Sequence, residues 1–152
     1  MIKIIGIGKI KDKHLEALIE DYTKKISRYH KIEVIEVKDE PIKDDEKAVL
    51  DVEASRALSK IKDNEYVILL DLHGKTTDSV KFAKHLDNLF ITSSHITFVI
   101  GGSLGLGEAL LSRANERLKL SDMTFLHGMT RLILVEQIYR SFKILNNETY
   151  HK

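Results

Sequence analysis

The chain has 152 residues, 43% of them hydrophobic and 31% charged, which is the balance of a globular protein long enough to bury one core. The absence of cysteine excludes a disulfide framework, a thiolate metal site and a cysteine nucleophile. With 24 basic and 23 acidic residues the net charge is only +1, which argues against a dedicated RNA-binding module without excluding an RNA substrate. We therefore expect a single domain over residues 1–152.

The hydrophobic pattern predicts strands and helices in alternation along the chain. Short apolar runs indicate strands, and apolar residues at helical spacing indicate helices. In chain order we expect strand 2–7, a helix from the N-cap Asp12 to Ile26, strand 32–37, helix 44–61, strand 66–72, helix 77–90, strand 95–100, helix 108–118, strand 123–126 and helix 130–145. This order predicts an α/β fold with a mainly parallel sheet flanked by helices.

No targeting or membrane-spanning segment is expected. Lys3 and Lys9 leave the apolar N-terminus too short for a signal core. The longest uncharged stretch, residues 88–107, is interrupted by the polar residues 92–95 and ends in a glycine cluster. We expect a soluble, cytoplasmic protein with no membrane partner.

Three segments should lie at the ligand-binding edge of the sheet, because ligands of open parallel sheets bind beyond the carboxyl ends of the strands. They are residues 70–75, 100–107 and 126–131, and each contains glycine. Two nucleotide-binding motifs are absent. Gly74-Lys75-Thr76 lacks the first glycine of a P-loop, and Gly6-Ile7-Gly8 is not continued as a dinucleotide fingerprint. The histidines lack the paired spacing of a metal site, so no metal is expected.

The C-terminal tail allows two interpretations. A terminal tail is usually frayed. One that ends in Tyr150, His151 and Lys152 has side chains that could instead reach a substrate.

Several of these segments resemble the RlmH family of SPOUT methyltransferases. The resemblance runs from the opening residues 3–9 to the final Tyr150-His151-Lys152, and it is carried by Leu70–Lys75 (LDLHGK), Phe98–Ser103 (FVIGGS), Met123-Thr124-Phe125 with His127, and Arg131 to Arg140 with Glu136-Gln137 between them. It implies an enzyme that uses S-adenosylmethionine to methylate N3 of a pseudouridine in 23S ribosomal RNA, with the assembled ribosome as substrate. It also implies a SPOUT fold with a C-terminal trefoil knot within about residues 66–150, and a homodimer in which the partner subunit completes the substrate site.

The resemblance implies a cofactor site made of eleven positions, which are Leu70, Gly101, Gly102, Gly105, Leu120, Ser121, Asp122, Met123, Thr124, Phe125 and Leu126. Leu126 departs from the family, which commonly has proline before His127. That loop is therefore expected to be looser here.

Methylation at N3 requires that the imide proton leaves, and a histidine or an arginine could assist. The candidates are His151, His127, Arg140 and Arg131, with Tyr150 as a stacking or hydroxyl contact to the base. The residues leave open which of them acts. Two other functions also stay open, namely a SPOUT methyltransferase of transfer RNA and a non-catalytic module that binds S-adenosylmethionine.

Overall fold

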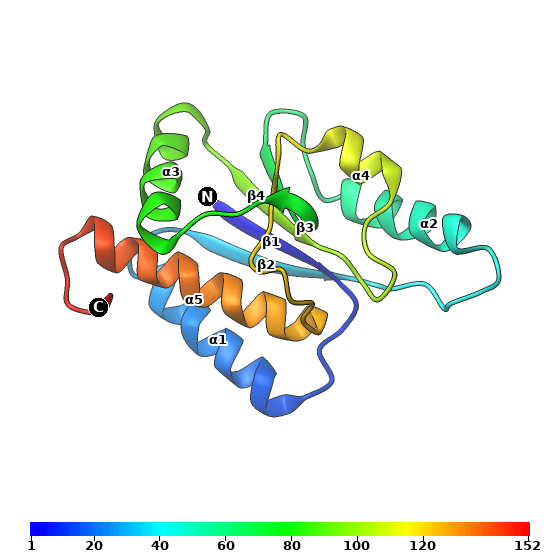
Figure 1. The fold of residues 1–152 in the computed structure, drawn as a ribbon, viewed down its shortest axis with the longest axis horizontal. Coiled ribbons are helices and arrows are strands. Elements are labelled where there is room, and N and C mark those ends of the chain that lie inside the picture. Colours follow the sequence, from blue (N-terminus) through cyan, green and yellow to red (C-terminus); the bar gives the residue numbers. More distant parts are fainter.

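The computed structural model describes all residues from Met1 to Lys152 and shows one five-stranded sheet (Figure 1). In chain order the elements are β1 (Ile2–Ile7), α1 (Lys13–Ser27), β2 (Ile32–Val37), α2 (Glu46–Leu58), β3 (Tyr66–Lys75), α3 (Ser79–Thr92), β4 (Ile96–Ile100), α4 (Glu108–Arg113), β5 (Glu116–Leu118) and α5 (His127–Leu145). The strand order is β2-β1-β4-β3-β5, and every strand pair is parallel. The predicted α/β class and flanked parallel sheet are confirmed.

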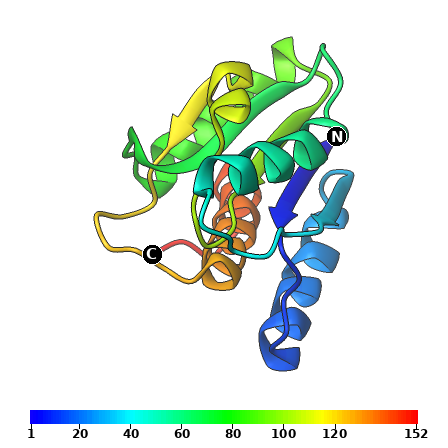
Figure 2. The ribbon, with the colours of Figure 1, turned by 90° about the vertical axis from the view of Figure 1, so that its right-hand side faces the viewer.

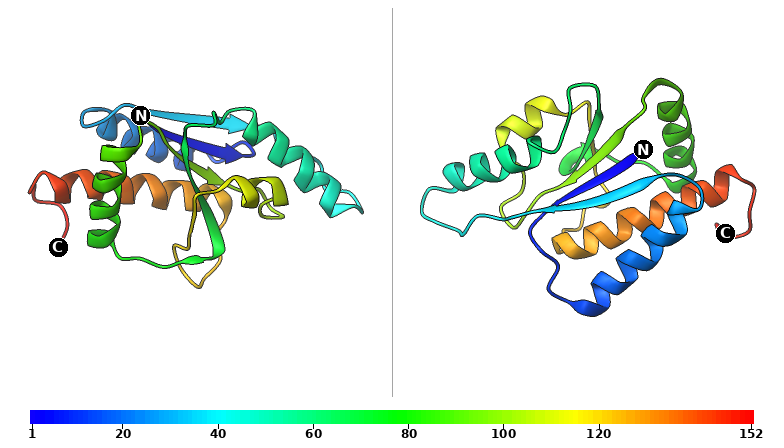
Figure 3. Two further views of the ribbon diagram at one scale, coloured as in Figure 1. Left: turned by 90° about the horizontal axis from the view of Figure 1, so that it is seen from above. Right: turned by 180° about the vertical axis from the view of Figure 1, so that it is seen from behind.

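Helices cover both faces of the sheet (Figures 1 and 3). On one face α5 packs beside α1 and α3, over a cluster that includes Ile4, Phe98 and Ile138. On the other face α2 packs beside α4, over a cluster that includes Ile5 and Val99. The neighbours Ile4 and Ile5 enter different clusters because successive strand side chains point to opposite faces.

A polar group lies inside this apolar sheet. The Lys3 ammonium donates to Glu65 Oε1 at 2.6 Å and to the Lys60 carbonyl at 2.7 Å, and the Thr97 hydroxyl donates to Glu65 Oε2 at 2.7 Å. Burial raises the pKa of the Glu65 carboxyl, but the hydrogen bonds from Lys3 and Thr97 outweigh this and hold that pKa below its usual value.

Four predictions near the site were wrong, and one of them is the end of β3, which was expected at Leu72 and lies at Lys75. Residues 123–126 are not a strand, because β5 is Glu116–Leu118, within the stretch that the hydrophobic spacing assigned to a helix. The helix predicted over 108–118 ends at Arg113, where Asn115 bonds both backbone groups of Val67 and directs the chain alongside β3. The last helix begins at His127, three residues earlier than expected.

The segment between β5 and α5 loops away from the sheet before the last helix begins (Figure 2). It ends at Leu126, the N-cap of α5, whose φ of −56° is one that proline also adopts. A proline would therefore fit at position 126 without a change in φ. No helix is both long and apolar enough to cross a membrane.

Candidate active site

A cavity of about 690 Å³ opens at the carboxyl ends of β3, β4 and β5. Its walls come from all three segments that the sequence placed at this edge of the sheet. Each of the eleven expected cofactor positions lines it except Asp122, whose side chain is exposed and pairs with Lys119 at 2.6 Å. The sheet therefore brings together residues from position 70 to position 126.

The loop after β4 turns back on itself at the cavity wall. The Gly105 amide donates to the Gly102 carbonyl at 3.1 Å, and Gly105 has a φ of +92°, which favours glycine. A Cβ atom at Gly101 would collide with the Gly105 carbonyl group. The amides of Ser103 and Leu104 donate to no other group of the chain, which leaves them free for a ligand.

Charged groups also line the cavity. Asp71 accepts the His73 amide at 3.0 Å and lies 3.6 Å from the Arg117 guanidinium. The strands β3 and β5 shift register between Leu70 and Lys75, and this irregularity holds residues 71–73 at the cavity. The wall thus presents one carboxylate and one guanidinium to a bound molecule.

His127 and Arg131 lie one helical turn apart but in different surroundings. His127 lines the cavity, whereas the Arg131 side chain is only 2% exposed and does not line it. The Arg131 guanidinium pairs with Glu36 at 2.6 Å and donates to the Gly8 carbonyl at 3.1 Å. It also fills the space that a side chain at Gly6 would need.

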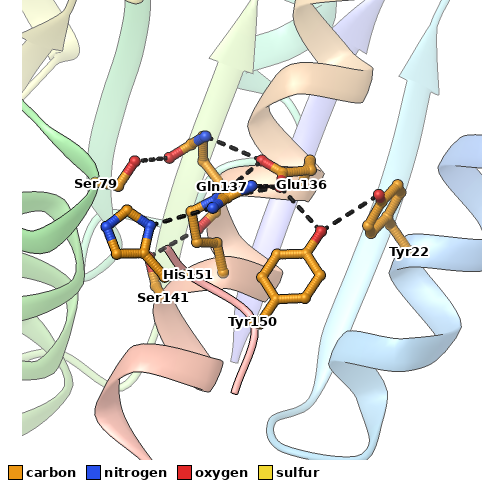
Figure 4. A network of polar contacts seen from close by, with 8 residues as sticks. Tyr22, Ser79, Glu136, Gln137, Ser141, Tyr150 and His151 are labelled. Atoms are coloured by element: carbon orange, nitrogen blue, oxygen red, sulfur yellow. Dashed lines mark hydrogen bonds and ion pairs between the residues drawn. The ribbon is translucent and has the colours of Figure 1, made fainter. Parts of the chain in front are cut away.

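The tail is folded against α5 instead of frayed (Figure 4). The Tyr150 hydroxyl donates to Glu136 Oε1 at 3.0 Å, and its ring lies under the Arg140 guanidinium, 4.8 Å from the ring centre. Burial and the hydrogen bonds with Tyr22 and Glu136 raise the pKa of Tyr150, so this hydroxyl stays protonated at neutral pH. Arg140 also contacts the Nδ1 atom of His151 at 3.1 Å.

The tail group and the large cavity are separate in one chain, because Arg140, Tyr150 and His151 do not line that cavity. A second cavity of about 330 Å³ lies between them. It shares Leu120 and Phe125 with the large cavity and reaches Gln137, which donates to Glu136 at 2.9 Å.

Comparison with known proteins gives the family. The sequence profile described as "Predicted SPOUT methyltransferase" matches residues 1–151. The chain belongs to this family. The SPOUT methyltransferase is 48% identical to a protein of Acetivibrio thermocellus and 48% identical to one of Ruminiclostridium cellulolyticum. It is 49% identical to a protein of Clostridium botulinum strain Langeland. Each relative is named "Ribosomal RNA large subunit methyltransferase H", and each alignment covers 99% of both chains.

Several polar residues that the structure of this SPOUT methyltransferase brings together were not predicted from the sequence as site residues. Tyr22, Ser79, Glu136 and Gln137 form one hydrogen-bonded chain with Arg140 and the tail. One signal was available, since Glu136 and Gln137 are adjacent polar residues within the apolar first half of the last helix. Ser79 on α3 bonds Gln137 and Tyr22 on α1 bonds Tyr150, each more than 50 positions away in the chain, so only the fold could identify these two residues. No three acidic or histidine side chains are placed to hold a metal ion.

Proposed function

We propose that this SPOUT methyltransferase transfers a methyl group from S-adenosylmethionine to N3 of a pseudouridine in 23S ribosomal RNA, with the assembled ribosome as its substrate. Membership of the family makes the chain a methyltransferase, and the name of its full-length relatives gives ribosomal RNA as the class of substrate. The observation that carries the proposal is the cavity at the carboxyl ends of β3, β4 and β5. A ribosomal substrate would place the protein in the cytoplasm.

The residues present fit S-adenosylmethionine. The cavity has the volume of a small-molecule site and combines apolar walls, such as Leu70 and Leu118, with the free amides of Ser103 and Leu104. Leu70, the loop 101–105 and residues 120–126 would hold the cofactor, with Asp122 acting through the loop shape that its ion pair with Lys119 supports. When bound, the cofactor supplies an activated methyl group, which removes the need for a nucleophilic side chain.

The protein's own residues must orient the base and assist the departure of the proton from N3. We assign contact with the base to His127, at the cavity, and to Arg140, Tyr150 and His151, at the tail. Tyr150 donates its only O–H proton to Glu136 and therefore offers the base its ring face. We assign Arg131 to support of the start of α5, because its guanidinium is buried and engaged by Glu36 and Gly8.

We propose a homodimer in which the partner's tail completes the substrate site. Three apolar side chains at the cavity rim are strongly exposed in one chain, with Leu72 at 52%, Met123 at 74% and Leu126 at 77%. An apolar rim of this kind is typical of a surface that a second protein covers. Neither Tyr150 nor His151 lines the cavity of its own chain, which is consistent with a contribution in trans. We also propose that residues 66–150 contain the trefoil knot of the family. The loops 100–106 and 119–126, close together at one cavity, support this.

The test uses ribosomes from a strain that lacks the enzyme. Purified protein and methyl-labelled S-adenosylmethionine are incubated with whole ribosomes, free 23S RNA or transfer RNA, and the labelled nucleotide is located by mass mapping. We expect label at a single pseudouridine of the ribosome. Label in transfer RNA would favour the alternative substrate, and cofactor binding without any transfer would favour a non-catalytic module.

A separate experiment tests whether the site is shared between the two subunits. Gly101→Val and His151→Ala should each abolish transfer, whereas a mixture of the two variants should recover activity. Mixed dimers contain one intact pocket and one intact tail on opposite chains. No recovery in a mixture shown to contain mixed dimers would contradict a site shared in trans.

A further inference from the structure

Glu136, in the middle of α5, is the residue on which the tail network converges (Figure 4). Its carboxylate accepts three donors. The Arg140 guanidinium donates through Nε at 3.1 Å and Nη2 at 2.5 Å, the Tyr150 hydroxyl donates at 3.0 Å, and the Gln137 amide donates at 2.9 Å. Both guanidinium bonds reach the same oxygen, Oε1, which also accepts from Tyr150, so two N–H groups hold the arginine at one point of the carboxylate. Glu136 therefore fixes the orientation of Arg140.

The shape of the tail depends on these side chains. No backbone hydrogen bond involves residues 149–152. Tyr150 is held by its hydroxyl bond to Glu136, by the Arg140 guanidinium over its ring and by the edge of Tyr139, 5.0 Å between ring centres. A fourth contact joins its hydroxyl to that of Tyr22 at 3.5 Å, and two of the four involve Glu136 or the arginine that Glu136 orients. Removal of the carboxylate would therefore loosen the tail, which would keep its contacts with Tyr22 and Tyr139.

The contact between Arg140 and His151 determines where the imidazole carries its proton. A guanidinium has only donors, so the Nδ1 atom that lies 3.1 Å from Arg140 Nη1 must accept. The proton of a neutral ring is then on Nε2, and His151 presents an N–H donor on its free side. A ring held in this way would hydrogen-bond a carbonyl oxygen of the base and would not accept the N3 proton through Nδ1.

We propose that Glu136 is a positioning residue that, through Arg140 and Tyr150, orders the tail and keeps His151 in the Nε2–H form. This inference rests on the proposed function and deepens it, because it names the group that shapes the substrate side of the site. The branch from Glu136 through Gln137 to the Ser79 hydroxyl, at 2.7 Å, links this positioning group to the wall of the second cavity.

The test compares Glu136→Gln, Glu136→Ala and the control Glu20→Gln. The control removes the same charge from an exposed position on α1. The Gln variant is nearly isosteric and keeps one oxygen for Arg140 and Tyr150, but it loses the negative charge and the second oxygen, which accepts from Gln137. We expect the kcat of methyl transfer to fall on the order of 10²-fold in the Ala variant, as for a misplaced reacting group, and less in the Gln variant. The Kd for S-adenosylmethionine and the KM for ribosomes should stay within about twofold of the parent, as should all three values in the control.

A second readout does not depend on activity. Nitrogen NMR of ¹⁵N-histidine-labelled protein, with His151 assigned from the spectrum of His151→Ala, reports which ring nitrogen carries the proton. The parent should show the Nε2–H form, and the Ala variant should show a mixture of tautomers. An Ala variant with the parental tautomer and the parental kcat would overturn the proposal, and so would a parent in which Nδ1 is protonated. If the parent transfers no methyl group, the proposed function fails, while the NMR result still decides the role of Glu136.

Discussion

Replacement of Arg131 by methionine should destabilise the fold strongly while leaving the cavity able to bind cofactor. The change removes the ion pair with Glu36 and the bond to the Gly8 carbonyl, both made by a side chain that is 98% buried. Loss of one partner of a buried ion pair costs about 3–5 kcal/mol. Glu36 is 38% exposed and keeps a bond from the Ile10 amide at 3.2 Å, so its charge can be solvated again. We therefore expect a loss of about 2–3 kcal/mol in the free energy of unfolding.

For a domain of this size such a loss corresponds to a fall in Tm of about 4–12 °C. Thermal and urea unfolding would measure it, with calorimetry of S-adenosylmethionine binding well below the Tm. Glu36→Gln is the companion variant, because it keeps an oxygen acceptor for Arg131 but leaves the buried guanidinium without its counter-charge; we expect it to lose at least as much stability as Arg131→Met. The reasoning is refuted if Arg131→Met unfolds within 2 °C of the parent and yet transfers no methyl group. That result would indicate that Arg131 takes part in methyl transfer.

Three further results are expected. Gly101→Val should weaken S-adenosylmethionine binding at least tenfold by calorimetry, because its side chain would collide with the Gly105 carbonyl and open the loop; normal affinity would show that the cofactor pocket is elsewhere. Deletion of residues 149–152 should lower stability by about 1 kcal/mol, through loss of the bond between Tyr150 and Glu136, and should abolish transfer without affecting cofactor binding. Turnover of ribosomes by the truncated protein at the parental rate would contradict this role of the tail. The lowered pKa of Glu65 stabilises the fold above the ordinary glutamate value of 4.5, and this stability should be lost as the pH falls through the lower folded value. Glu65→Gln should therefore show a flatter dependence of Tm on pH between 5 and 3, and an equally steep dependence would rule out this carboxyl as the cause.

Most of the sheet was predictable because its central strands are continuous apolar runs. The central strands β1 and β4 lie within one residue of the predicted bounds, as expected for segments whose side chains are buried on both faces. The edge strand β2 also has its predicted bounds, because its apolar residues alternate with Glu33 and Glu36. The edge strand β5 was not predictable. Its residues Glu116, Arg117 and Leu118 favour helix locally, and they form a strand where Asn115 ties the chain to β3 and the ladder with Ile68 to Leu70 follows.

The candidate site, like the sheet, has one part that could be predicted from the sequence and another that could not. The cavity was placed from the sequence because parallel strands end at one edge, a rule that needs only strand positions. The burial of Arg131 could not be foreseen, because it depends on Gly6, 125 positions earlier in the chain, having no side chain. The tail network depends likewise on residues of α1 and α3 that become neighbours of α5 only in the folded protein.

The ion pair between Lys3 and Glu65 also bears on how the strands find their alignment during folding. Apolar strands such as β1, β3 and β4 could slide past one another by two residues and still bury hydrophobic side chains on both faces. In the native alignment Lys3 is paired in register with Thr97, and both reach Glu65 just before β3 begins. A slip of two residues would separate these groups and leave an ammonium and a carboxylate buried without partners, which is strongly unfavourable. One polar cluster thereby selects a single register among several that hydrophobic burial alone would tolerate.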